Sequence, residues 1–125
     1  MNSKAAILLV DDEEEFVNTL AERLEIRGFQ PEVATSGQQA VELMEKRNFD
    51  VMVLDVKMPG MDGLQVMEKA RTLRPDLPVI LLTGHGSADD GVQGMHQGAF
   101  DFLMKPLDID DLISKIREAL AESSS

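Results

Sequence analysis

Short apolar runs alternate along the chain with segments whose apolar residues recur at helical spacing. Three of these runs, Ala5 to Val10, Val51 to Leu54 and Val79 to Leu82, contain no polar residue at all. An unbroken run of this length is typical of a strand buried on both faces, as in a parallel sheet covered by helices. The pattern predicts strands at residues 5–10, 31–34, 51–55, 79–82 and 99–104.

The segments after the first two predicted strands show the apolar spacing of amphipathic helices. The first such segment begins with Phe16 and stops at Gly28, a residue that commonly ends helices. The second opens at Ser36, and Gln39 three residues later completes a capping-box pattern. The sequence therefore predicts a helix after each of these strands.

Three further helices follow the remaining predicted strands. The third ends before Pro75, because the residue preceding a proline is disfavoured in helical conformation. The fourth, at about residues 88–97, contains Gly91 and Gly94, each unfavourable by roughly 1 kcal/mol relative to alanine. We expect this helix to be the least stable. Asp108 is positioned to cap the last one.

Five strands alternating with five helices predict an α/β fold in which a parallel sheet is doubly wound by right-handed crossovers. We expect the strand order 2-1-3-4-5, which is a flavodoxin-like three-layer sandwich, and one domain spanning residues 1–125. In this order the topological switch lies between the first and third strands, and ligands bind beyond the carboxyl ends of such strands.

Composition narrows the function classes. The formal net charge of −11 and the pI near 4.4 argue against direct binding to nucleic acid. The chain has no cysteine, which excludes disulfides, thiolate metal sites and cysteine nucleophiles. The opening apolar segment stops at Asp11, so it resembles neither a secretory signal nor a membrane span. We therefore expect a cytoplasmic protein that does not bind membranes.

The polar residues of interest all follow predicted strands, and so are expected at one edge of the sheet. Asp11 and Asp12 follow the first strand, Asp55 ends the third, Thr83 follows the fourth and Lys105 the fifth. Crowded carboxylates raise one another's pKa unless cations neutralise them. Oxygen ligands without histidine or thiolate favour Mg²⁺, which is usually completed by phosphate oxygens. An aspartate beside Mg²⁺ can act as a nucleophile toward phosphorus, which would give an aspartyl phosphate.

These residues stand in motifs that resemble the response-regulator receiver domains of two-component signalling, which are CheY-like. The resemblance covers nearly the whole chain. The motifs are Leu9-Val10-Asp11-Asp12, Leu54-Asp55-Val56-Lys57-Met58-Pro59-Gly60-Met61-Asp62-Gly63, Leu82-Thr83-Gly84 and Gly98-Ala99-Phe100-Asp101-Phe102-Leu103-Met104-Lys105-Pro106. In addition, Thr83-Gly84-His85-Gly86 resembles the receivers of transcriptional activators.

The resemblance implies a role for each site residue. Asp55 would be the phosphoacceptor, and Thr83 and Lys105 would bind the phosphoryl oxygens. Mg²⁺ would be held by Asp12, Asp55 and the Lys57 main-chain carbonyl, with Asp11 holding a metal-bound water. It also implies a cis peptide bond between Lys105 and Pro106.

The resemblance further implies how the signal enters and leaves the domain. A sensor histidine kinase or a histidine phosphotransfer protein would donate the phosphoryl group, and the domain would catalyse its own phosphorylation and dephosphorylation without being a turnover enzyme. Thr83 and Phe102 would be switch residues that change the packing of the face formed by the fourth helix, fifth strand and fifth helix. That face would act on an output domain or protein, and could form a dimer. Phe102 stands where many relatives carry tyrosine, so its ring has no hydroxyl to bond a partner.

Three alternatives stay open at the level of sequence. An aspartyl-nucleophile phosphatase would need an acid two residues after Asp55, where Lys57 stands. A flavin-binding module would need a phosphate loop after the first strand, whereas Asp11 to Glu15 are acidic and would repel phosphate. A receiver-like scaffold that is never phosphorylated would be expected to lack one of the site residues, and none is missing.

Overall fold

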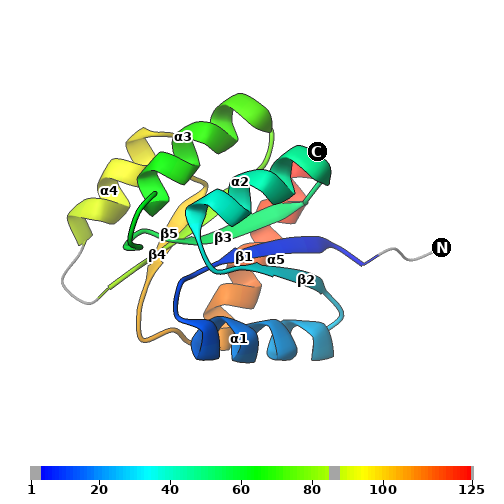
Figure 1. The fold of residues 1–125 in the computed structure, drawn as a ribbon. Helices are drawn as coiled ribbons and strands as arrows, with labels where there is room; N and C mark the ends of the chain where they lie inside the picture. Colours follow the sequence, from blue (N-terminus) through cyan, green and yellow to red (C-terminus); the bar gives the residue numbers. More distant parts are fainter. Residues whose placement is uncertain (1–3, 85–87, 125) are drawn as a thin grey trace.

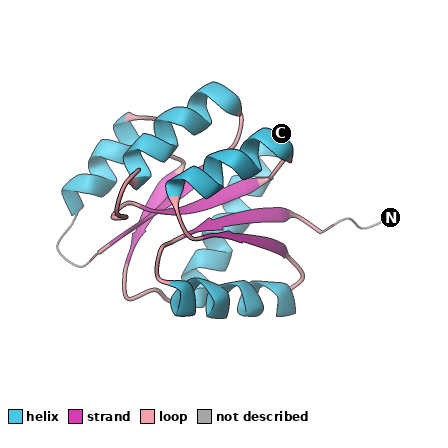
Figure 2. Ribbon diagram, in the orientation of Figure 1, coloured by secondary structure: helices cyan, strands magenta, loops and turns pink. Residues whose placement is uncertain are grey.

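The computed structural model describes residues 4–84 and 88–124, which form a three-layer α/β sandwich (Figure 1, Figure 2). The strands are β1 (Ala6–Val10), β2 (Gln30–Ala34), β3 (Val51–Asp55), β4 (Val79–Thr83) and β5 (Asp101–Met104). The helices are α1 (Glu14–Ile26), α2 (Gly37–Lys46), α3 (Gly63–Leu73), α4 (Ala88–His96) and α5 (Ile109–Ser124). Every predicted strand and helix is present, and the ends of the strands lie within two residues of the predicted ones.

All strand pairs in the sheet are parallel, and the strand order is β2-β1-β3-β4-β5, as the sequence predicts. β1, β3 and β4 occupy the centre, which is why the apolar runs in these segments are uninterrupted. Pro31 lies in the edge strand β2, where a missing N–H costs the sheet least. The topological switch between β1 and β3 therefore places Asp11 and Asp55 next to each other at the carboxyl edge.

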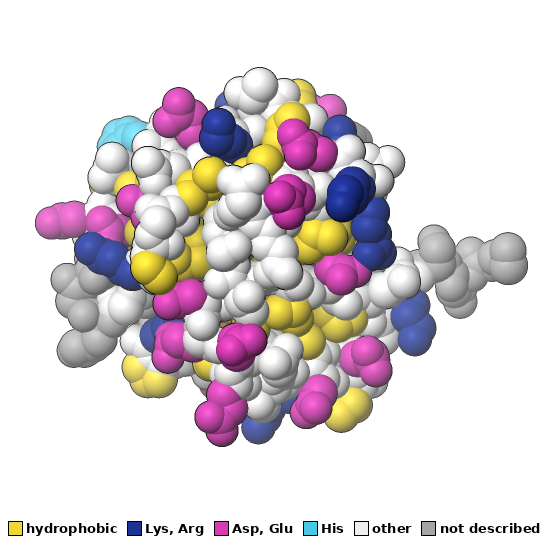
Figure 3. All heavy atoms as spheres, in the orientation of Figure 1, with side chains coloured by type: hydrophobic (Ala, Val, Ile, Leu, Met, Phe, Trp, Pro, Cys, Tyr) yellow, Lys and Arg dark blue, Asp and Glu magenta, His cyan; other side chains and the backbone are white. Residues whose placement is uncertain are grey.

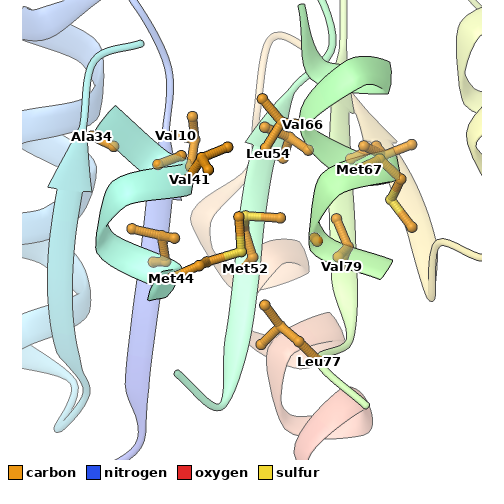
Figure 4. Packing of buried hydrophobic residues seen from close by; sticks show 14 of the residues in the cluster. Val10, Ala34, Val41, Met44, Met52, Leu54, Val66, Met67, Leu77 and Val79 are labelled. Atoms are coloured by element: carbon orange, nitrogen blue, oxygen red, sulfur yellow. The ribbon is translucent and has the colours of Figure 1, made fainter. Parts of the chain in front are cut away.

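Two apolar cores lie on opposite faces of the sheet. Helices α2, α3 and α4 cover one face, and α1 and α5 cover the other (Figure 1). Figure 4 shows the first core, where Met44 of α2 lies against Met52 of β3 and Val66 of α3 lies over Leu54 of β3. Alternate residues of each central strand point into the two cores, so β3 is buried along its whole length. This burial fixes the position of Asp55 at its end.

The helix ends follow local rules that are partly visible in the sequence. Gly28 adopts φ +93° after α1, and the N–H of Phe29 donates to the Leu24 carbonyl oxygen at 3.1 Å, which satisfies the end of the helix. At α2 the Ser36 hydroxyl accepts from the N–H of Gln39, as predicted. The Gln39 side chain, however, accepts from the N–H of Thr35 and not from that of Ser36, so only half of the predicted capping box forms.

The two glycines in α4 have a packing role that helix propensity does not indicate. A Cβ at Gly91 would lie 2.4 Å from Cδ2 of the Phe102 ring, and a Cβ at Gly94 would lie 1.9 Å from Cδ1 of Leu81. The absence of side chains therefore lets α4 approach β4 and β5 closely. The helical cost of these residues is offset by contact with the sheet.

The surface is predominantly acidic, as the composition requires. Acidic side chains are spread over the face shown in Figure 3, whereas many of the basic ones lie toward its right-hand edge. None of the helices in the described part of the chain has the length and apolar character needed to span a bilayer.

Candidate functional site

Three carboxylates meet at the carboxyl edge of the sheet. Asp11 and Asp12 follow β1, and Asp55 is the last residue of β3. One oxygen from each of the three lies within 4.8 Å of the others, which is close enough for all of them to bind one ion. Asp11 and Asp55 are 1% and 5% exposed, and Asp12 is the most open of the three. The sequence prediction that these side chains converge is confirmed.

Lys105 brings a positive charge to the same place. Its Nζ atom lies 2.8 Å from Asp11 Oδ2, 3.0 Å from Glu13 Oε1 and 3.9 Å from Asp55 Oδ1. The ammonium also lies 4.5 Å from the centroid of the Phe16 ring. The peptide bond between Lys105 and Pro106 is cis, as expected. The part played by Glu13 and Phe16 was not predicted, because 92 residues separate Glu13 from Lys105 and no local pattern links them.

The electrostatics of Asp55 follow from this arrangement. Burial raises the pKa of Asp55 from 3.8 to about 7, and the neighbouring charge of Asp11 acts in the same direction. Lys105 and the main-chain N–H of Lys57 oppose the shift, and Asp12 adds a smaller increase. The one lysine therefore does not compensate the burial and mutual repulsion of the carboxylates. A further cation would relieve both.

Lys105 shows the reciprocal effect. Burial alone would lower the pKa of its ammonium, but the hydrogen bonds to Asp11 and Glu13 outweigh burial and raise it. Lys105 thus stays charged at neutral pH and remains available to bind an anion at this edge.

Thr83 ends β4 and is completely buried. Its hydroxyl oxygen has no hydrogen-bond partner among the residues that the structure describes. A buried, unpartnered hydroxyl is costly, and such groups commonly meet a ligand or water. The main-chain carbonyl of Thr83 accepts from the N–H of Lys105 at 2.7 Å, so the ends of β4 and β5 are joined directly behind the site.

The loop after Asp55 is held against the site by main-chain contacts. The N–H of Val56 donates to the Leu82 carbonyl oxygen at 3.0 Å, and the N–H of Gly63 donates to the Val56 carbonyl oxygen at 2.8 Å. A Cβ at Gly63 would lie 2.4 Å from the main-chain oxygen of Asp55, so only glycine fits there. At the start of α3, Asp62 and Gln65 form a complete capping box. The Asp-x-x-Gln spacing is a signal that the sequence reasoning missed.

The side chains of Lys57 and Phe102 lie outside the charged cluster. The side chain of Lys57 is 72% exposed, and its Nζ lies 3.6 Å from Asp90 Oδ2 in α4. Metal binding by its carbonyl stays a prediction. Phe102 is partly buried against the core on the α4 face, with its ring over Gly91. His85 and Gly86, part of the motif noted in the sequence, lie outside the described residues.

This set of groups fits a hard divalent cation and a phosphoryl group. The three carboxylates supply the oxygen donors that Mg²⁺ prefers, and neither histidine nor thiolate is among them. Lys105 and the unpartnered Thr83 hydroxyl supply donors for anionic oxygens.

The family comparison agrees with this chemistry. A family model described as the response regulator receiver domain matches residues 7–117. The chain belongs to this receiver domain family. Receiver domains are parts of the response regulators of two-component systems, and the family is not a classical enzyme family.

The receiver domain is similar to part of much longer regulators. It is 38% identical over 120 residues to the transcriptional regulatory protein GlrR of Escherichia coli strain K12, which covers 96% of this chain and 27% of that protein. It is 35% identical over 119 residues to the C4-dicarboxylate transport transcriptional regulatory protein DctD of Rhizobium meliloti, which covers 95% of this chain and 26% of that protein. The chain thus spans about a quarter of the length of these relatives.

Solved structures show the same fold. A CheY-like receiver domain protein from Methanospirillum hungatei superposes with a TM-score of 0.92 at 34% identity, covering 98% of both chains. The receiver domain of NtrX from Brucella abortus has a TM-score of 0.88 at 32% identity, covering 92% of this chain and 98% of that one. The predicted CheY-like architecture is confirmed.

Proposed function

We propose that residues 1–125 form one receiver domain in which Asp55 is the phosphoacceptor. The observation that carries this proposal is that Asp55 is buried within reach of Asp11, Asp12 and Lys105, with its pKa raised toward neutrality. The burial and repulsion that raise the pKa of this carboxylate would be relieved by a bound metal ion and by covalent attachment of a phosphoryl group. Lys57 stands where an aspartyl phosphatase would need an acid, and its exposed side chain argues further against that alternative.

The carboxylates of Asp12 and Asp55 and the carbonyl of Lys57 would hold Mg²⁺, with Asp11 holding a metal-bound water. When bound, Mg²⁺ neutralises these carboxylates and withdraws charge from the phosphoryl oxygens. Thr83 Oγ1 and Lys105 Nζ would bind two of those oxygens. The hydrogen bond between their main chains keeps the two residues next to each other at the ends of β4 and β5.

The phosphoryl donor would be a phosphohistidine of a sensor kinase or of a histidine phosphotransfer protein. One Asp55 carboxylate oxygen forms the new bond to phosphorus, the P–N bond breaks, and the histidine nitrogen keeps the electron pair and takes up a proton. In hydrolysis, a water oxygen bonds to phosphorus and Asp55 leaves as carboxylate. The domain catalyses both steps on itself, which makes it a switch and not a turnover enzyme.

The output would pass through the face formed by α4, β5 and α5. Phosphorylation would draw Thr83 and Lys105 inward and change the packing of Phe102 against Gly91, which would alter this face. The face would then act on an output domain or a separate protein, and could pair with a second copy. The net charge of −11 leaves any contact with nucleic acid to that output domain or protein. We place the protein in the cytoplasm, where a kinase with access to ATP would supply the phosphoryl group.

Incubation with acetyl phosphate and Mg²⁺, followed by intact mass measurement, tests this proposal. The wild-type protein should gain the mass of one phosphoryl group, and Asp55→Asn should gain none. Asp76→Asn, at an exposed turn residue, is a matched control and should be labelled like wild type. Undiminished labelling of Asp55→Asn, or loss of labelling in Asp76→Asn, would contradict the assignment.

A further inference from the structure

Lys105 forms an ion pair with Asp55 but donates no hydrogen bond to it in the unphosphorylated structure. Its ammonium donates hydrogen bonds to Asp11 Oδ2 and Glu13 Oε1, at 2.8 Å and 3.0 Å. The distance to Asp55 Oδ1 is 3.9 Å, which is too long for a hydrogen bond. The two hydrogen bonds to Asp11 and Glu13 use two of the three ammonium donors and fix the position of Nζ, so any shift of the ammonium toward an oxygen on a phosphorylated Asp55 would stretch one of them. Asp11 belongs to the carboxylate cluster, whereas Glu13 does not.

The side chain of Glu13 has no local structural duty that would explain its position. Glu13 is the N-cap residue of α1, yet its side chain makes no capping hydrogen bond. Its own N–H donates to Asp11 Oδ1 at 2.9 Å, which ties the start of the helix to the site. The Glu13 carboxylate, 64% exposed, reaches Lys105 instead. The Phe16 ring, one turn along α1, lies 4.5 Å from the same ammonium and adds a cation–π contact.

We propose that Glu13 is a positioning residue that holds Lys105 in a resting place, supported by Phe16, and so slows capture of the phosphoryl group. The proposal rests on the proposed function, since it assigns Glu13 a role in the phosphorylation of Asp55. Glu13 never touches the reacting atoms and acts only through Lys105. An exposed ion pair of this kind contributes about 0.5–1 kcal/mol, so releasing it should raise the phosphorylation rate about two- to fivefold.

Three variants separate the contact from the charge. Glu13→Ala removes both, and Glu13→Asp keeps the charge but is one methylene too short for the same contact. Glu15→Gln removes a charge two residues further along the same acidic run. Among the described residues, Lys105 pairs with Asp11, Glu13 and Asp55, and Glu15 is not one of its partners. Glu15→Gln is therefore the matched charge control.

The initial rate of phosphoryl gain from acetyl phosphate in Mg²⁺ is measured for each protein by intact mass. Glu13→Ala and Glu13→Asp should both be faster than wild type, and Glu15→Gln should match wild type. Equal rates for Glu13→Asp and wild type, with Glu15→Gln as fast as Glu13→Ala, would show a general charge effect and overturn the proposal. A slower Glu13→Ala would overturn it as well.

A second measurement does not depend on phosphorylation. In Mg²⁺-free protein, the NMR signals of the Lys105 side chain should shift in both Glu13 variants and stay unchanged in Glu15→Gln. Unchanged signals in Glu13→Ala would show that the contact is absent in solution and would overturn the proposal while leaving the phosphoacceptor role intact. Failure of wild type to be labelled would instead overturn the proposed function, and this role for Glu13 with it.

Discussion

Replacing Asp55 by asparagine removes a charge that the folded protein holds in unfavourable surroundings. Burial and the charge of Asp11 raise the pKa of Asp55 from 3.8 to about 7 in the metal-free site. The unfolded chain has no such site, so its Asp55 ionises near the ordinary value. Asparagine has nearly the same shape and carries no charge. We therefore expect Asp55→Asn to be more stable than wild type in the absence of a divalent cation.

The sign and the pH window follow from the direction of the shift. Below about pH 4, Asp55 is protonated in both states, and its ionisation affects stability little. Between about pH 4 and 7 the folded state binds more protons than the unfolded state, so wild type loses stability as pH rises. Above about pH 7 the loss is complete and stays constant.

A shift of about three pKa units corresponds to about 4 kcal/mol, which is the upper limit of this effect. The site opens to solvent beside Asp12, and screening there lowers the expected value to about 2 kcal/mol. The advantage of Asp55→Asn over wild type should thus be about 2 kcal/mol at pH 8 and less than half of that at pH 5. Both pH values lie above the sequence pI of about 4.4, so the protein keeps a net negative charge in both experiments.

Urea unfolding in EDTA at the two pH values measures this difference. Far-ultraviolet circular dichroism is the suitable signal, because the chain has neither tryptophan nor tyrosine. Asp76→Asn serves as the control and should behave like wild type at both pH values. Adding Mg²⁺ at pH 8 should stabilise wild type more than Asp55→Asn, since Mg²⁺ relieves the charge that the variant lacks. The reasoning would be refuted if Asp55→Asn were less stable than wild type at pH 8. It would also be refuted if the stability advantage of Asp55→Asn over wild type were the same at both pH values.

Three further predictions concern the walls of the site. Thr83→Val should leave the free energy of unfolding unchanged or raise it by about 1 kcal/mol, because it removes an unpartnered buried hydroxyl. Labelling of this variant by acetyl phosphate should slow by at least about tenfold, and labelling at the wild-type rate would contradict the role of Thr83. Gly63→Ala should destabilise by about 2 kcal/mol in urea, although alanine favours helices, because its Cβ would lie 2.4 Å from the Asp55 main-chain oxygen. Asp62→Ala should cost about 1 kcal/mol in the same assay through loss of the capping box with Gln65, and no change would show that the cap contributes nothing.

The sheet and the carboxylate cluster could be predicted because each rests on short-range signals. An unbroken apolar run such as Val79 to Leu82 indicates a strand buried on both faces, and the order of the strands follows from the crossover rules. The residues that follow such strands are then brought to one edge by topology alone. Asp55 and Asp11 meet for this reason, and no side-chain detail is needed to predict it.

Contacts that depend on side-chain reach could not be predicted in the same way. Glu13 stands in a run of acidic residues at the start of α1, where the helix dipole is a sufficient explanation for each of them. Only the conformation of Lys105 distinguishes Glu13 from its neighbours. Helix propensity alone indicates that Gly91 and Gly94 destabilise their helix. Propensity describes an isolated helix and does not include the strand side chains that pack against these two glycines.

The packing of α4 connects the site to the proposed output face through two strands at once. β4 ends at Thr83, and its Leu81 lies against Gly94 of α4. β5 contains Phe102, which lies over Gly91 of α4, and Lys105 follows this strand. The two strand ends are joined by the hydrogen bond from the Lys105 N–H to the Thr83 carbonyl oxygen, so a movement of one toward Asp55 would act on the other. Gly91 and Gly94 have no side chains that could change rotamer. A displacement of either strand would therefore have to move helix α4 or displace the Phe102 ring. The central strand β3 is buried on both faces, so the proposed movement of the β4 and β5 ends would take place against a fixed strand.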